Sequence, residues 1–188
     1  MTQPIAGQLP YVPARLVEGT RSLSAIRFLV VHDTQSPDHG GVDDATAVAH
    51  YFQSAGAGGS ANVVFDDEGG VRCVWDREIP AAAPPCNTDG LHSEFCGFTT
   101  WTTDEWLAHR LSLERGAYHF AEWSKITGVP LEFLAAADLA KPGATGVTTH
   151  AEISAAFHET DHTDPGPNFP MTFFLNVAKA YKALLVLG

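Results

Sequence analysis

Short apolar runs bounded by polar or glycine-rich segments recur along the 188-residue chain, and their periodicity predicts its strands and helices. Residues 25–31, AIRFLVV, are rich in β-branched side chains and predict a buried strand that stops directly before His32. Residues 62–76 contain two β-prone runs around a Gly-Gly pair, which is the pattern of a hairpin. Residues 146–153, GVTTHAEI, predict another strand that ends near His150.

Alternation predicts a further strand in residues 91–98, LHSEFCGF. A period of two divides its side chains between the two faces of a sheet, with Leu91, Ser93 and Phe95 on one face and His92, Glu94 and Cys96 on the other. The pattern therefore gives Glu94 a defined side of the sheet.

Helical signals separate these strands. Asp43 or Asp44 can cap a helix that runs to about Ser54. One face of this helix would carry Val48, Tyr51 and Phe52. A longer helix is predicted over 105–127, with Thr103 or Asp104 as the cap and Gly128 and Pro130 as stop signals.

The C-terminal segment also has helical spacing, in its apolar residues Phe173, Phe174, Val177, Tyr181 and Leu184. The order of strands and helices predicts an α/β fold, a single domain with a central mixed β-sheet flanked by helices. Residues 1–20 contain three prolines and little periodicity. We therefore expect residues 1–24 to form an extended arm on a domain of residues 25–188.

Charge narrows the classes of partner. The net charge of −11 argues against nucleic acid, because neutralising phosphates requires clusters of Lys and Arg. No apolar stretch reaches the roughly 18 residues of a membrane span, so no membrane insertion is expected. The N-terminus lacks the pattern of a signal peptide. Cys73, Cys86 and Cys96 are odd in number and lack CxxC spacing, which favours reduced, partly buried thiols.

Nine histidines are present, and most need no special role. A single histidine without a surrounding motif is more often an ordinary surface or core residue than a ligand. This interpretation applies to His39, His50, His109, His119 and His158. Among them, His119 is the one that we expect to be buried.

His32 and His150 differ, because each stands where a predicted strand ends. Asp164 follows in the proline-stiffened loop DHTDPGP. Two imidazoles and one carboxylate are a common catalytic zinc set, which leaves the fourth position for water. Spacing alone does not select this triple, because many combinations of His, His and Asp exist in the chain.

Five segments together resemble, in order, the landmarks of one family: FLVVHDT, SANVVFDDEGGVRCVWD, GLHSEF, GVTTHAEIS and DHTDPGPNFP. They resemble the zinc-dependent N-acetylmuramoyl-L-alanine amidases, a family that also includes the peptidoglycan recognition proteins. The resemblance runs from about Ala25 to Phe174. Its most specific part is a histidine after a strand, followed fourteen residues later by the aspartate of a TDPGP loop.

The resemblance implies roles for five residues. His32, His150 and Asp164 would be the ligands of Zn²⁺, which polarises the amide carbonyl and lowers the pKa of its bound water. Glu94 would act as general base and then general acid. His162 would donate a hydrogen bond to the oxyanion. The plainer alternatives are a solvated carboxylate for Glu94 and an exposed loop residue for His162.

The substrate implied by the resemblance is bacterial peptidoglycan, cut between N-acetylmuramic acid and L-alanine. The loops 36–41 and 80–90 are the expected walls of the substrate groove, and Asn87 and His92 either contact substrate there or have no role. Asp33 is not expected to be a ligand, since consecutive strand residues point to opposite faces. Asn62 and Val63 replace the His-Tyr pair of many relatives, and 80–87 lacks their Trp and His-Ala-Gly, so the preferred stem peptide is open.

An intact ligand set without a signal peptide looks most like a phage endolysin. Such a monomeric enzyme would be made in the host cytoplasm and act on the cell wall after release. Two alternatives remain. One is a recognition module of the same fold that binds peptidoglycan without cutting it. The other is a zinc peptidase that cuts within the stem peptide.

Overall fold

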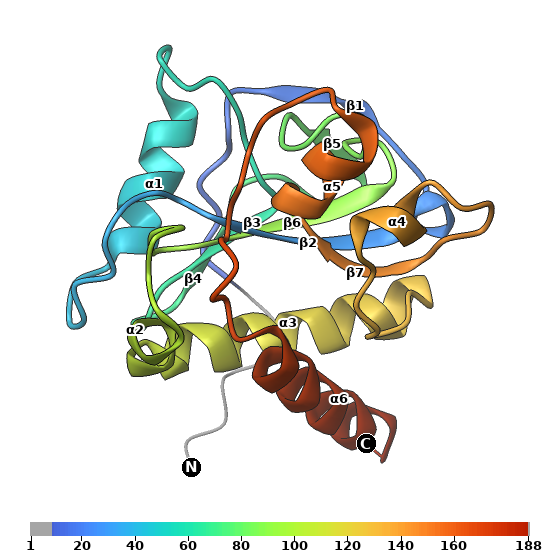
Figure 1. Cartoon of the computed structure of the whole chain (residues 1–188). Coiled ribbons are helices and arrows are strands. Elements are labelled where there is room, and N and C mark those ends of the chain that lie inside the picture. The colour runs from blue at the N-terminus through green and yellow to red at the C-terminus, as the bar shows by residue number, and fades with distance from the viewer. Residues whose placement is uncertain (1–8, 188) are drawn as a thin grey trace.

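A five-stranded mixed sheet lies at the centre of the computed structural model, which describes residues 9–187 (Figure 1). Across the sheet the strands are β4 (Gly70–Arg72), β3 (Val63–Phe65), β6 (Gly90–Phe95), β2 (Phe28–Asp33) and β7 (Gly146–Thr149). The neighbours β3, β6, β2 and β7 are parallel, and β4 is antiparallel to β3. The predicted α/β domain with a mixed sheet is confirmed.

Helices and a small second sheet surround this centre. β1 (Val17–Thr20) pairs antiparallel with β5 (Glu78–Pro80). The helices are the 3-10 helix η1 (Leu23–Ala25) and the α-helices α1 (Asp44–Gln53), α2 (Thr103–Ala108), α3 (Arg110–Thr127), α4 (Ala136–Leu139), α5 (His150–Phe157) and α6 (Met171–Leu187). Among the described residues, none of these helices has the length and apolarity that crossing a membrane requires.

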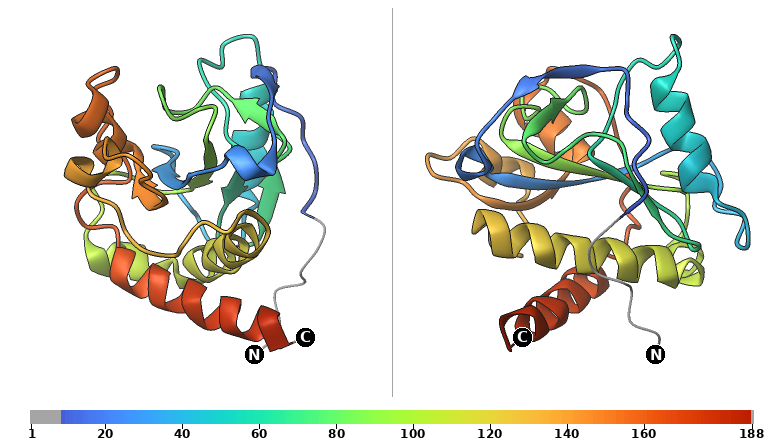
Figure 2. Two further views of the ribbon diagram at one scale, coloured as in Figure 1. Left: turned by 90° about the vertical axis from the view of Figure 1, so that its right-hand side faces the viewer. Right: turned by 180° about the vertical axis from the view of Figure 1, so that it is seen from behind.

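The two faces of the sheet pack against different helices. Figure 2 shows α3 and α6 on one side of the sheet and α4 and α5 on the other. The side chains of Leu29, Val31 and Leu91 belong to the large apolar core that includes α3 and α6. Phe28 and Val30 point the other way and pack in a smaller cluster with α4 and α5. His32 continues the alternation of Phe28 and Val30, so it lies on the side away from α3.

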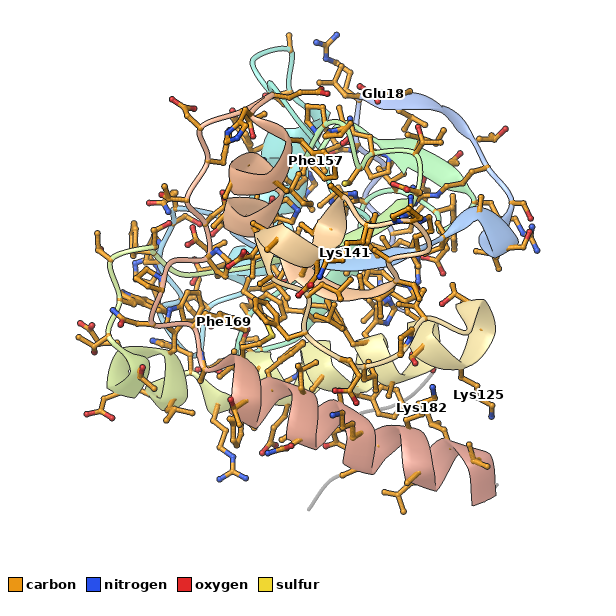
Figure 3. All side chains as sticks on the ribbon, turned by 45° about the vertical axis from the view of Figure 1, so that its right-hand side comes forward. Glu18, Lys125, Lys141, Phe157, Phe169 and Lys182 are labelled. Carbon is orange, nitrogen blue, oxygen red and sulfur yellow. The ribbon has the colours of Figure 1, made fainter. Side chains whose placement is uncertain are left out.

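Polar contacts join α3 to α6 at the edge of the large core. The Lys125 ammonium donates to the Leu185 carbonyl at 2.6 Å, and the Lys182 ammonium donates to the Ser124 hydroxyl at 2.7 Å. The two lysines are labelled in Figure 3, where they lie between these helices. These hydrogen bonds thus link the two helices that cover this face of the sheet.

Several predicted bounds are confirmed and others move. The hairpin of residues 62–76 is present as β3 and β4, and Gly128 ends α3 in the left-handed conformation with φ 81°. The strand predicted over 25–31 instead begins at Phe28 and includes His32, because Leu23–Ala25 form a 3-10 helix capped by Ser22.

The prediction of one long helix over 105–127, capped by Thr103 or Asp104, was wrong in two respects, since the helix is broken at His109 and its N-cap is Thr102. Thr102 caps the first piece through a capping box with Glu105, and His109 has φ −95° and ψ 46°. The His109 ring stacks on Trp101 with centroids 4.7 Å apart and lies 3.0 Å from an Asp67 oxygen. These tertiary contacts outweigh the local helical preference.

Two predicted helix faces also need correction. In α1 the buried side chains are Ala45, Ala49 and Phe52, whereas Tyr51 is 54% exposed. In α6 Leu184 is 64% exposed, while Phe174 is fully buried. The strand before His150 ends at Thr149, whose hydroxyl caps an unpredicted helix, α5, that begins at His150 itself.

Candidate metal centre

The site lies at the carboxyl ends of the parallel strands β7, β2 and β6, on the face away from α3. In the register of the sheet, His32 pairs with Glu94 and Val30 pairs with His92. Residues paired in a parallel ladder share a face, so His32, His92 and Glu94 all point to this side. β7 adjoins β2, and its successor His150 starts α5 at the same edge.

Asp164 reaches this edge from a loop that two contacts hold in place. The Ala151 N–H in the first turn of α5 donates to the Asp164 carbonyl at 2.9 Å. Gly166 has φ 85°, and a Cβ there would lie 2.1 Å from the Thr99 carbonyl oxygen. Only glycine therefore lets the loop pass so close to Thr99.

His32, His150 and Asp164 converge in the folded chain, although they lie far apart in sequence. The Nδ1 atom of His32 is 3.1 Å from Asp164 Oδ2, and the Nδ1 atom of His150 is 3.2 Å from Asp164 Oδ1. Their side chains are 3%, 3% and 9% exposed, and their ligand atoms lie within 4.8 Å of one another. This buried group could hold a metal ion.

The surroundings favour the charged form of the Asp164 carboxylate and the neutral form of the His150 imidazole. Burial by itself would raise the pKa of Asp164, but the contacts with His150 and His32 outweigh burial and hold that pKa well below its usual range. Burial also lowers the pKa of His150, despite the opposing effect of Asp164. A carboxylate with a neutral imidazole is the state in which these groups bind a metal ion.

Glu94 stands beside this group with one oxygen unused. The residue is partly exposed, yet its Oε2 atom is buried and has no hydrogen-bond partner among the described residues. Burial raises the pKa of Glu94 well above its ordinary value, and the negative charges of Asp164 and Asp33 raise it further. An unpaired buried carboxyl oxygen is costly, and such groups concentrate at functional sites.

His162 lies at the rim of the same group. Its ring stacks on that of His150, with centroids 4.1 Å apart and an interplanar angle of 13°. Its Nδ1 atom lies 3.2 Å from Asp164 Oδ1, while its side chain remains 57% exposed. All five residues singled out in the sequence are thus in one place, with His162 facing solvent.

Other residues considered in the sequence lie elsewhere. Asp33 accepts hydrogen bonds from Gln35 and Thr99 and is not in the metal-ligand group. Burial raises its pKa to about 6, against the lowering effect of those hydrogen bonds. The Asn87 side-chain oxygen accepts hydrogen bonds from the Ala82 and Ala83 N–H groups in the 80–90 loop. Its side-chain nitrogen donates to Glu18, which is labelled in Figure 3. Asn87 therefore has a structural task.

His92 is the functional candidate whose position the sequence did not reveal. It is 0% exposed, so it cannot contact a sugar or a peptide. Its Nδ1 atom lies 3.0 Å from Nε2 of His32, behind the metal-ligand group. Alternation with Glu94 was the only signal in the sequence, and it placed the two on one face without indicating this contact.

The remaining histidines largely match the plain interpretation. His39, His50 and His158 are exposed, and His119 is buried, as predicted. His109 belongs to a second group of ligand-type side chains, with Asp38 and Asp67.

The cysteines are free and fully buried. Burial raises the pKa of the Cys73 and Cys86 thiols to about 12. Since the thiolate is the reactive form, these thiols are chemically quiet at neutral pH.

Comparison with solved structures shows that this fold occurs in hydrolases and endolysins. The hydrolase AmiA of Staphylococcus aureus, solved with its ligand, has a TM-score of 0.73 at 15% identity, over 97% of this chain and 86% of that one. N-acetylmuramoyl-L-alanine amidase LysC from Clostridium intestinale has a TM-score of 0.54 at 12% identity, over 96% and 99%.

A mutant endolysin from Bacillus subtilis has a TM-score of 0.57 at 14% identity, over 94% of this chain and 97% of that one. Identities this low show a shared fold and no more. No protein-family model matches the chain, and no curated protein matches it.

Proposed function

We propose that this chain is a zinc-dependent hydrolase that cleaves the amide bond between N-acetylmuramic acid and L-alanine in bacterial peptidoglycan. The observation that carries the proposal is the convergence of His32, His150 and Asp164 beside Glu94. The likeness in fold to an N-acetylmuramoyl-L-alanine amidase supports the choice of bond.

The donor set fits zinc. Two imidazole nitrogens and one carboxylate oxygen are a frequent catalytic zinc set, and they leave a position open for water and substrate. Both rings turn Nδ1 toward the same carboxylate, at 3.1 and 3.2 Å. Zinc held by His32, His150 and Asp164 would supply Lewis acidity, which would polarise the amide carbonyl and make water more acidic.

Glu94 would carry the proton. Its buried Oε2 has no partner among the described residues, so it is available to accept a proton from the attacking water. The raised pKa suits a group that holds this proton and then delivers it to the departing L-alanine amine. Base and acid would thus be one residue, which requires no nucleophilic Ser or Cys.

His162 would donate a hydrogen bond to the oxyanion of the tetrahedral intermediate. Its exposed ring at the rim of the site and its contact with Asp164 support this role. Stacking on His150 limits the orientation of the ring, and donors fixed in advance are the ones that stabilise a transition state most effectively.

We further propose that residues 25–188 form the catalytic domain and residues 1–24 an arm along it. In the described part of that segment, Val12 and Ala14 donate to the carbonyls of Arg72 and Cys73. Residues 1–8 lie outside the described residues. The fold likeness to an endolysin supports a role in cell-wall lysis. We propose in addition that the enzyme is a monomer of phage origin, made in the host cytoplasm and acting on the cell wall after release.

Purified sacculi incubated with the protein and zinc test the proposal. We expect new L-alanine N-termini to appear, together with glycan and stem peptides that are each intact by mass spectrometry. Heat-denatured protein and protein treated with a chelator are the controls.

Two outcomes would replace the proposal. Binding to sacculi without any release, in protein that demonstrably contains zinc, would make the chain a recognition module. Shortened stem peptides would make it a peptidase that cuts within the stem.

A further inference from the structure

His92 is a buried polar side chain that the proposed reaction does not use. It is 0% exposed and both ring nitrogens have partners. Nε2 lies 3.2 Å from the Cys86 carbonyl oxygen, and Nδ1 lies 3.0 Å from Nε2 of His32. A chain of contacts thus runs from a backbone carbonyl, through His92, to a proposed metal ligand.

Elementary chemistry decides which atom is the donor in each of these two hydrogen bonds. A carbonyl oxygen can only accept, so Nε2 of His92 must donate to Cys86. A second proton on the ring would leave a buried charge with no carboxylate in hydrogen-bond contact among the residues that the structure describes, at high cost. Nδ1 of His92 is therefore an acceptor, and Nε2 of His32 must be the donor to it.

This direction determines which nitrogen of His32 is free. With its proton on Nε2, the neutral His32 ring has its lone pair on Nδ1, the atom that lies 3.1 Å from Asp164 Oδ2. We propose that His92 is a positioning residue, which holds His32 in the tautomer whose Nδ1 is open to a metal ion. The inference rests on the proposed function in one respect, namely that His32 binds a metal.

The backbone around His92 leaves space for its ring and holds the Cys86 carbonyl in place. A Cβ on Gly90 would lie 2.6 Å from both the Cys86 oxygen and His92 Nε2, the two atoms of the hydrogen bond. The Arg21 guanidinium donates to the Asn87 and Gly90 carbonyls at 2.6 Å, which holds the segment that carries Cys86. Glycine at position 90 and the anchored loop together leave room for the ring of His92 and fix the acceptor behind it.

Three variants test the inference by zinc affinity, measured in competition with a chromogenic chelator. His92→Leu removes the acceptor and puts an apolar side chain of similar size in its place. His92→Asn retains an amide oxygen near the place of Nδ1. His119→Leu is the matched control, because His119 is also buried but lies between Phe65 and Trp123, in the large core on the other side of the sheet.

We expect His92→Leu to weaken zinc binding about 10–100-fold, as loss of a hydrogen-bond partner behind a metal ligand does elsewhere. His92→Asn should recover most of the affinity, and His119→Leu should match the parent protein. A purely structural role predicts that Asn, which is smaller and more polar, does no better than Leu. Equal affinity of parent and His92→Leu, or equal weakening by Leu and Asn, would overturn the inference.

A measurement on the unaltered protein covers the case in which His92→Leu does not fold. Two-bond ¹H–¹⁵N correlation spectra of the zinc-free protein report which nitrogen of His32 carries the proton. We expect Nε2 to carry a proton, and an unprotonated Nε2 would refute the assignment. If the parent protein binds no zinc, the proposed function fails, while these spectra still decide whether His92 sets the tautomer.

Discussion

Within residues 9–187 there are two groups of ligand-type side chains, and they differ in which groups form hydrogen bonds with their polar atoms. The first is His32, His150 and Asp164, and the second is Asp38, Asp67 and His109. In the first group the hydrogen-bond contacts of the ring nitrogens and carboxylate oxygens are with other side chains. The neighbouring Glu94 has a buried oxygen with no hydrogen-bond partner in the described part of the chain.

The second group is satisfied by the backbone. Asp38 accepts from the Asp67 N–H at 2.8 Å and from the Gly40 N–H at 3.2 Å. Asp67 accepts from the Ser112 N–H at 3.0 Å and lies 3.0 Å from His109 Nδ1. These contacts tie two loops to the break between α2 and α3. A cluster of aspartate and histidine side chains can therefore be either a metal site or a structural cross-link. The two cases differ in whether backbone N–H groups already occupy the lone pairs of the carboxylate oxygens.

The largest effect on zinc affinity is expected when the same Asp→Asn substitution is made in each group in turn. Asp164→Asn removes the charge from the first group. We expect zinc affinity to fall by more than about 100-fold, because loss of a direct ligand should exceed loss of a residue that only hydrogen-bonds to a ligand. Turnover of sacculi should fall below detection. Asp67→Asn in the second group is the control, with unchanged zinc content. Loss of zinc from Asp67→Asn, with Asp164→Asn still loaded, would exchange the roles of the groups.

Glu94→Gln removes the acid and base while keeping the size of the side chain. We expect the rate of amide cleavage to fall about 10²–10⁴-fold, the usual contribution of a positioned proton-transfer group. Zinc content should stay at the level of the parent protein, which elemental analysis checks. An active Glu94→Gln enzyme would remove Glu94 as the general base.

His162→Ala tests the rim of the first group. At saturating zinc we expect the rate to fall about 10²–10³-fold, as for loss of one oxyanion donor. His50→Ala is the control, because His50 is exposed and its side chain hydrogen-bonds to Gln53, outside the site. If both variants retain full activity, His162 is an exposed loop residue without a catalytic role.

The smallest effect is expected in the second group. Asp67→Asn should lower the free energy of unfolding by about 1–3 kcal/mol, because an amide replaces a charged acceptor of hydrogen bonds. Thermal unfolding of the zinc-loaded protein measures this, and activity below the transition should be that of the parent. A rise in Tm on adding zinc to Asp164→Asn that disappears when Asp67→Asn is added would show that the second group binds metal after all.

Local pattern determined much of the fold and the types of residue in the site. Alternation placed His92 and Glu94 on one face of a strand, and the Gly-Gly pair between β-prone runs marked the hairpin. These features depend on neighbours in sequence, so they can be predicted from it. The break at His109 depends on Asp67 and Trp101, which no local pattern contains.

The sequence by itself supplied the kinds of group that the site requires, namely imidazoles at strand ends and an aspartate in a proline-stiffened loop. Only the tertiary structure decided which of nine histidines meet that aspartate, and that His92 lies behind His32. The physical reason is that parallel strands bring together segments separated by long crossovers. Register across those strands, set by the packing of the whole core, is what selects one combination of side chains among many.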